Sequence, residues 1–129
     1  MKKSKELDAL KAELNKLKKE GKILLAYLYG SYAAGTEHKR SDIDLAICLN
    51  AVDEKEASDI IDAILMVSER PVEILRLDDE EESPFVIQEA LKGIPLIEPD
   101  LEALYRVANR ALHETEDIRH RRTIASGKS

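Results

Sequence analysis

The stretch SDIDLAICL, residues 41–49, constrains the fold of this chain more than any other segment, because polar and apolar residues alternate along it. Successive side chains of a β-strand point to opposite faces of a sheet. The residues on the face that can pack in a core are Ile43, Leu45, Ile47 and Leu49. The residues on the other face are Asp42, Asp44, Ala46 and Cys48. The pattern therefore predicts a strand that begins with two carboxylates on one face.

The remaining segments predict helices and strands around this one. Apolar residues spaced by three or four predict helices over residues 1–20, about 57–65, 84–91 and 99–122. Strands are predicted over residues 22–30 and 70–77, with a short fourth strand over 93–98 and a disordered tail over 123–129. This order indicates an α/β (α+β) fold, a small mixed sheet with helices packed on one face.

The length and composition favour one soluble domain spanning residues 1–129, with a catalytic core over 21–98 between the two terminal helices. No apolar run is long enough to cross a membrane, and no signal peptide is present, so a cytoplasmic location is expected. A single cysteine, Cys48, excludes an internal disulfide. The net charge is −6, and residues 50–102 carry sixteen acidic against four basic residues. This balance argues against direct binding of long nucleic acid.

The carboxylates raise an electrostatic problem. Asp42 and Asp44 are about 7 Å apart at their Cα atoms by strand rise, and Glu73 would join them if the strand over 70–77 pairs beside this one. At 4 Å and an effective dielectric constant near 20, each like-charge contact costs about 4 kcal/mol. A bound proton or a cation must relieve the repulsion between these carboxylates. Oxygen donors with open positions favour Mg²⁺ or Mn²⁺, particularly when phosphate oxygens complete the shell.

A glycine–serine pair, Gly30 and Ser31, follows the strand over residues 22–30. Gly30 permits a tight turn, and Ser31 would stand at a helix N-terminus, where free N–H groups and the helix dipole attract phosphate. A phosphate site beside a metal-binding carboxylate cluster indicates phosphoryl or nucleotidyl transfer with two metal ions.

The segment GSYAAGTEHKRSDID fits the pattern G-S-x10-D-x-D and resembles the DNA polymerase β-like nucleotidyltransferases. Over roughly residues 5–112 the chain resembles the minimal nucleotidyltransferases (MNT) of that superfamily. Glu73 falls at the position where members of the superfamily have their third acidic residue. One departure is Ala34, where many relatives have arginine, although Lys39 or Arg40 could replace that charge.

The resemblance implies a polymerase β-like fold and a role for each site residue. Gly30 and Ser31 would hold the β- and γ-phosphates of ATP, and Asp42 and Asp44 would bind two Mg²⁺ ions, or Mn²⁺. Glu73 would bind the catalytic metal and help deprotonate the acceptor hydroxyl, which attacks the α-phosphate.

The resemblance also implies a partner, because minimal nucleotidyltransferases commonly pair with HEPN-domain toxins. The expected function is that of an antitoxin that transfers AMP to a tyrosine of a HEPN ribonuclease. Two alternatives stay open: nucleotidyl transfer to a small hydroxylated molecule such as an aminoglycoside, and a non-catalytic antitoxin that only binds its partner. Whether the chain forms homo-oligomers or hetero-oligomers is also open.

Two further motifs do not indicate a functional site. Arg106 and His113 have the R-x6-H spacing of HEPN ribonucleases but are expected on the polar side of the last helix. The tail sequence GKS, residues 127–129, lacks the upstream glycine of a phosphate-binding loop, because Arg122 stands there.

Overall fold

A computed structural model of the chain describes residues 2–30 and 42–127. The helices are α1 (Lys2–Lys19), α3 (Glu54–Val67), α4 (Pro84–Leu91) and α5 (Leu101–Gly127). The strands are β1 (Ile23–Tyr29), β2 (Ile43–Leu49), β3 (Val72–Arg76) and β4 (Ile94–Pro95). The four strands form one sheet in the order β3-β2-β1-β4. Strand β2 is parallel to β3 and antiparallel to β1, and β4 is antiparallel to β1, so the predicted mixed sheet is confirmed.

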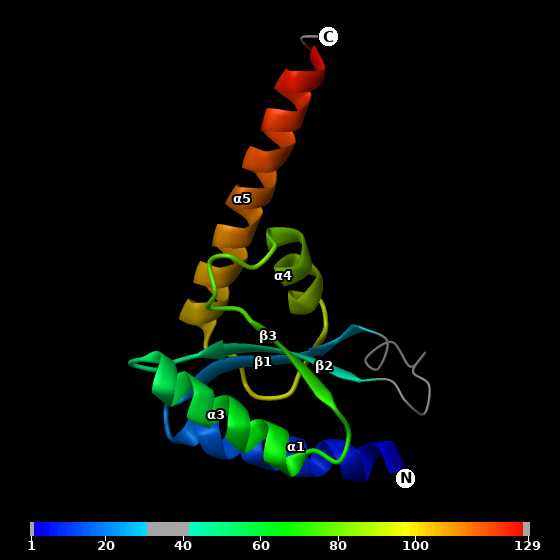
Figure 1. Cartoon of the computed structure of the whole chain (residues 1–129), viewed down its shortest axis with the longest axis vertical. Coiled ribbons are helices and arrows are strands. Elements are labelled where there is room, and N and C mark those ends of the chain that lie inside the picture. The colour runs from blue at the N-terminus through cyan, green and yellow to red at the C-terminus, as the bar shows by residue number, and fades with distance from the viewer. Residues whose placement is uncertain (1, 31–41, 128–129) are drawn as a thin grey trace.

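Helices α1 and α3 cover one face of the sheet (Figure 1). The apolar stripe that predicted α1 is buried here, because Leu10, Leu14 and Leu17 share one core with residues of β1, β2 and α3. Helix α1 ends in a Schellman motif, in which the amide of Gly21 donates to the carbonyl of Lys18 (2.9 Å) and the next amide donates to Leu17 (2.9 Å). Gly21 adopts φ +74°, the left-handed conformation that this motif requires.

Helices α4 and α5 cover the opposite face (Figure 1), so the expectation that all helices pack on one face is wrong. The reason lies in the strands. Tyr27 of β1 and Ala46 and Cys48 of β2 are apolar enough to form a second core, and Ala103 and Val107 of α5 are buried against them. A sheet with apolar residues on both faces needs a layer on each face to exclude water.

Helix α5 is longer than the sequence indicated. It begins after Asp100, whose carboxylate accepts from the amide of Ala103 (2.9 Å), and it continues to Gly127 rather than stopping at residue 122. Its C-terminal half projects well beyond α4 (Figure 1). A polar contact joins it to α4, because Gln88 of α4 donates to the buried hydroxyl of Thr115 (2.9 Å). Within the described ranges, no helix is both long and apolar enough to span a membrane.

Candidate active site

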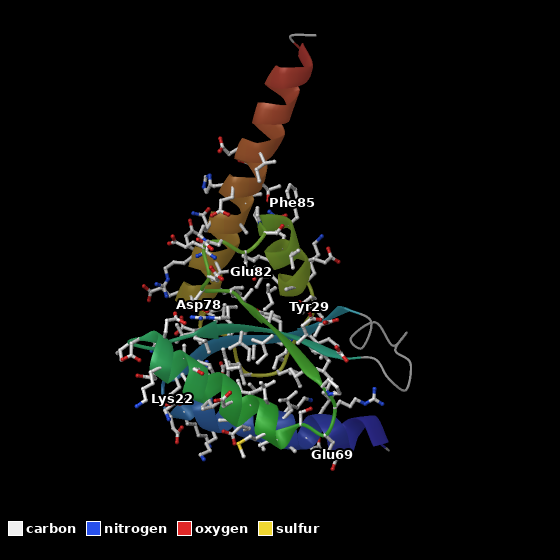
Figure 2. All side chains as sticks on the ribbon, in the orientation of Figure 1. Lys22, Tyr29, Glu69, Asp78, Glu82 and Phe85 are labelled. Carbon is white, nitrogen blue, oxygen red and sulfur yellow. The ribbon has the colours of Figure 1, made fainter. Side chains whose placement is uncertain are left out.

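The carboxylate pair at the start of β2 is assembled by strand pairing. Asp44 is the register partner of Glu73 in the parallel ladder with β3, and of Tyr29 in the antiparallel ladder with β1. Side chains at paired positions of neighbouring strands lie on the same face of the sheet. The predicted approach of the strand over residues 70–77 to the strand that carries Asp44 is therefore confirmed. All three side chains lie on the α4 face, where Tyr29 is labelled in Figure 2.

The electrostatics of this cluster match the repulsion expected from the sequence. Partial burial raises the pKa of Asp44, and the Glu73 carboxylate raises it further by its charge and by a hydrogen bond between the two groups. Asp42, which is exposed and directly precedes β2, adds a smaller effect in the same direction. Asp44 therefore holds its proton more readily than an isolated aspartic acid does, because it is partly buried and has like charges beside it.

Gly30 lies directly against Asp44. It adopts φ +77°, and a Cβ atom built on it would stand 2.3 Å from Asp44 Oδ2 and 3.1 Å from Asp44 Cγ. Only glycine fits here, because any other residue would both strain the backbone and collide with the carboxylate. Gly30, which the sequence predicted as part of a phosphate site, is thus in contact with the carboxylate that the sequence predicted as a metal ligand.

Several predicted residues fall outside the described ranges. Ser31, Ala34, Lys39 and Arg40 lie between residues 31 and 41, so their predicted roles stay predictions. Of the five predicted site residues, the structure describes Gly30, Asp42, Asp44 and Glu73, and it places all four at one end of the sheet.

The donor chemistry of this cluster suits Mg²⁺ or Mn²⁺, which prefer carboxylate oxygens. Among the described side chains, no three Asp, Glu, His or Cys residues are gathered closely enough to enclose a metal. Mg²⁺ does not need such a cage, since it is commonly bound by one or two carboxylates plus water and substrate phosphates. The adjacent Asp44 and Glu73 meet that lesser requirement, and Asp42 is close enough to act on Asp44 electrostatically.

Two residues at this site were not predicted as site residues. Burial raises the pKa of the Tyr29 phenol, and the charges of Asp44, Glu73 and Glu82 raise it further. Glu82 reaches this neighbourhood because the acidic segment 78–82 connects β3 to α4. Nothing in the composition of that segment distinguishes Glu82 from its acidic neighbours. The proximity of Tyr29 could have been inferred from its position directly before Gly30.

The raised pKa of Asp44 predicts a stability effect. When an acid has a higher pKa in the folded state than in the unfolded state, its ionisation lowers the stability of the folded protein. This loss of stability is absent at acidic pH and complete once the pH exceeds the folded pKa. Asp44→Asn removes this loss, and we expect it to stabilise the metal-free protein at neutral pH by roughly 0.5–2 kcal/mol, the usual gain at such sites. Denaturant unfolding with and without acidification measures this difference.

The matched control is Asp62→Asn, on the exposed surface of α3 in the opposite layer. It removes the same charge away from the carboxylate cluster, so we expect almost no change in unfolding free energy. If Asp44→Asn destabilised the protein at neutral pH, or if its advantage persisted unchanged at acidic pH, the electrostatic account of this cluster would be wrong.

Comparison with known proteins identifies the family. The family model described as polymerase beta, nucleotidyltransferase matches residues 13–102, which include the Gly30 turn and all three carboxylates. The chain belongs to this nucleotidyltransferase family. No curated protein matches it in sequence.

Solved structures share the fold at low sequence identity. A chain in the crystal structure of a toxin–antitoxin with AMP-PNP is 20% identical, with a TM-score of 0.65 over 92% of this chain and 96% of that one. A chain in the structure of a tri-AMPylated Shewanella oneidensis HEPN toxin in complex with its MNT antitoxin is 17% identical, with a TM-score of 0.60 over 92% and 94% of the two chains. The polymerase β-like fold expected from the resemblance is confirmed.

Proposed function

We propose that this chain is a Mg²⁺-dependent adenylyltransferase that transfers AMP from ATP to a tyrosine of a HEPN-domain toxin and acts as its antitoxin. The observation that carries the proposal is the contact of Gly30 with Asp44, which is itself paired with Glu73, within a nucleotidyltransferase fold. The turn supplies a phosphate site and the pair supplies metal ligands, which are the two elements that nucleotidyl transfer requires.

Each residue has a role in this reaction. Gly30, together with Ser31, binds the β- and γ-phosphates and directs the α-phosphate toward the carboxylates. Asp42, Asp44 and Glu73 would hold two Mg²⁺ ions, which when bound neutralise the phosphate charge and stabilise the leaving group. Glu73 also accepts the proton of the acceptor hydroxyl. The hydroxyl oxygen then forms a bond to the α-phosphorus, while the bond from that phosphorus to the β-bridging oxygen breaks and pyrophosphate leaves.

One observation supports a protein acceptor. The structural neighbours include a toxin–antitoxin complex with AMP-PNP and a complex whose HEPN toxin is tri-AMPylated. A partner protein that presents a tyrosine would form a wall of the site at the carboxylate end of the sheet.

The test combines the chain, the protein encoded beside its gene, which we expect to be a HEPN-domain protein, Mg²⁺ and ATP labelled at the α-phosphate. We expect label on a tyrosine of the HEPN protein, located by peptide mass spectrometry, and no transfer when EDTA replaces Mg²⁺. The control is the double variant Asp42→Asn with Asp44→Asn, which we expect to transfer nothing. Unlabelled HEPN protein combined with efficient transfer to an aminoglycoside would contradict the proposed acceptor.

A binding-only antitoxin is the second candidate. Helix α5 exposes an apolar stripe formed by Leu101 (76% exposed), Tyr105 (70%) and Leu112 (50%), which could contact a partner without catalysis. The same double variant separates the two functions. A toxin that is still silenced by Asp42→Asn with Asp44→Asn would establish binding alone, whereas a toxin that regains ribonuclease activity would support AMP transfer.

A further inference from the structure

A cavity of about 370 Å³ lies between α5 and the sheet, at the end of β2 away from Asp44. Its walls combine apolar side chains of β1, β2 and α5 with five polar ones: Cys48, Asn50, Asp78, Arg106 and Arg110. Cys48 stands four residues beyond Asp44, about 13 Å along the strand. Asp78 and Tyr29 accordingly lie on opposite sides of the molecule (Figure 2). The cavity is therefore separate from the candidate active site.

The two arginines of the cavity are one helical turn apart on α5 and share one face. Like charges at this spacing repel each other. The Arg106 side chain forms no hydrogen bond or ion pair with the residues that the structure describes, although its charge acts on the Cys48 thiol. Arg110 donates from Nη2 to the carbonyl of Leu77 (2.8 Å), and its Nε is 3.8 Å from the Glu114 carboxylate.

Arg110 has a spare donor inside the protein. Its Nε is buried and has no hydrogen-bond partner among the described groups, a state that is costly for a charged side chain. An acceptor in the cavity would satisfy this donor and relieve the repulsion between the two guanidinium groups. Guanidinium groups bind the oxygens of phosphate and carboxylate in a fork geometry, so an oxyanion is the acceptor that fits.

The other polar groups of the cavity do not supply that anion. Asp78 is already paired with Arg76 (2.8 Å) and also accepts from the amide of Leu49 (3.4 Å). Burial raises the pKa of Cys48 to about 11, despite the opposing charges of Arg106 and Arg110, so its thiol is neutral. Two guanidinium groups against the one carboxylate of Asp78 give the lining of the cavity a net positive charge.

We propose that this cavity binds a small molecule through a phosphate or carboxylate group held by Arg106 and Arg110. The volume is at the lower end of ligand pockets, which favours a compact ligand whose carbon atoms contact the apolar wall. This site is additional to the nucleotide site of the proposed function and does not depend on it.

The test is a ¹H–¹⁵N NMR titration of the full chain with sodium phosphate, and separately with sodium acetate, at constant ionic strength set with chloride. We expect saturable shifts of the amides of Cys48, Leu49 and Asn50 and of α5 around Arg106 and Arg110. The salt that saturates at lower concentration identifies the preferred group, phosphate or carboxylate. Shifts near Gly30 and Asp44 report the other site and are scored separately.

Two variants with equal charge change complete the test. Arg106→Gln with Arg110→Gln is expected to weaken binding at least tenfold, whereas Lys11→Gln with Lys55→Gln, on the exposed surface of α1 and α3, leaves it unchanged. Because Arg110 also holds Leu77, the single variant Arg106→Gln is measured as well, and it is expected to weaken binding severalfold in a folded protein. Shifts that do not saturate, or equal weakening by both double variants, would overturn the proposal.

Discussion

Asp44→Asn is expected to reduce AMP transfer at least about 1,000-fold. Metal coordination contributes several kcal/mol to transition-state stabilisation, and each 1.4 kcal/mol is a factor of ten in rate. An asparagine keeps the shape of Asp44 and its place between Tyr29 and Glu73, but it removes the charge that a divalent cation needs. Transfer rates at saturating ATP and Mg²⁺, measured beside the unfolding free energy, give the comparison.

The value of this variant lies in the opposite signs of its two effects. The same substitution is expected to stabilise the metal-free fold at neutral pH, because it relieves repulsion with Glu73 and Asp42. Loss of activity therefore cannot be attributed to unfolding. Asp62→Asn controls for the change in net charge and is expected to keep full activity. Retention of activity within tenfold by Asp44→Asn would remove Asp44 from the proposed catalytic site.

Gly30→Ala is expected to reduce transfer about 100-fold, the effect of displacing a catalytic group by roughly 1 Å. The new Cβ atom would stand 2.3 Å from Asp44 Oδ2, so the carboxylate must rotate away from its place beside Glu73. The positive φ of Gly30 adds a backbone cost of about 1–2 kcal/mol for any L-residue with a side chain. Stopped-time transfer assays and thermal unfolding of the same preparations separate the two contributions.

Gly21→Ala is the matched control, because Gly21 has nearly the same φ of +74° but nothing within 4 Å of the position of a Cβ atom. It is expected to lose a similar amount of stability and no activity. Equal activity losses in the two variants would show that backbone strain alone explains the effect of Gly30→Ala. The Gly30 turn would then have no specific relation to the Asp44 carboxylate.

The sequence alone predicted most of the elements of this fold. The alternation in residues 41–49 assigned Asp44 to the face opposite Leu45, and the structure agrees, because side-chain direction in a strand follows from the backbone pleat and needs no distant contact. The apolar spacing in α1 was equally informative. These signals are local, and they depend on residues within one or two turns of each other.

The tertiary structure decided which elements are neighbours. Helices cover both faces of the sheet because Ala46 and Cys48, on the same face as Asp44, form a second core with α5. The uninterrupted apolar residues of β1 indicate a strand that is buried on both faces, because such a strand lacks the alternation of polar and apolar residues. That burial depends on the packing of α4 and α5, which come much later in the chain, and no local pattern specifies it.

The candidate site, like the fold, was only partly predictable from the sequence. The spacing of Gly30, Asp42 and Asp44 could be read from the chain, but the place of Glu73 beside Asp44 required β3 to pair in parallel with β2 in one register. Glu82 near Tyr29, and two arginines of α5 facing a cavity, follow from chain segments that meet only after folding. Short-range sterics and periodicity determine each element, whereas the electrostatic environment of a side chain is set by whichever distant residues the folded core brings beside it.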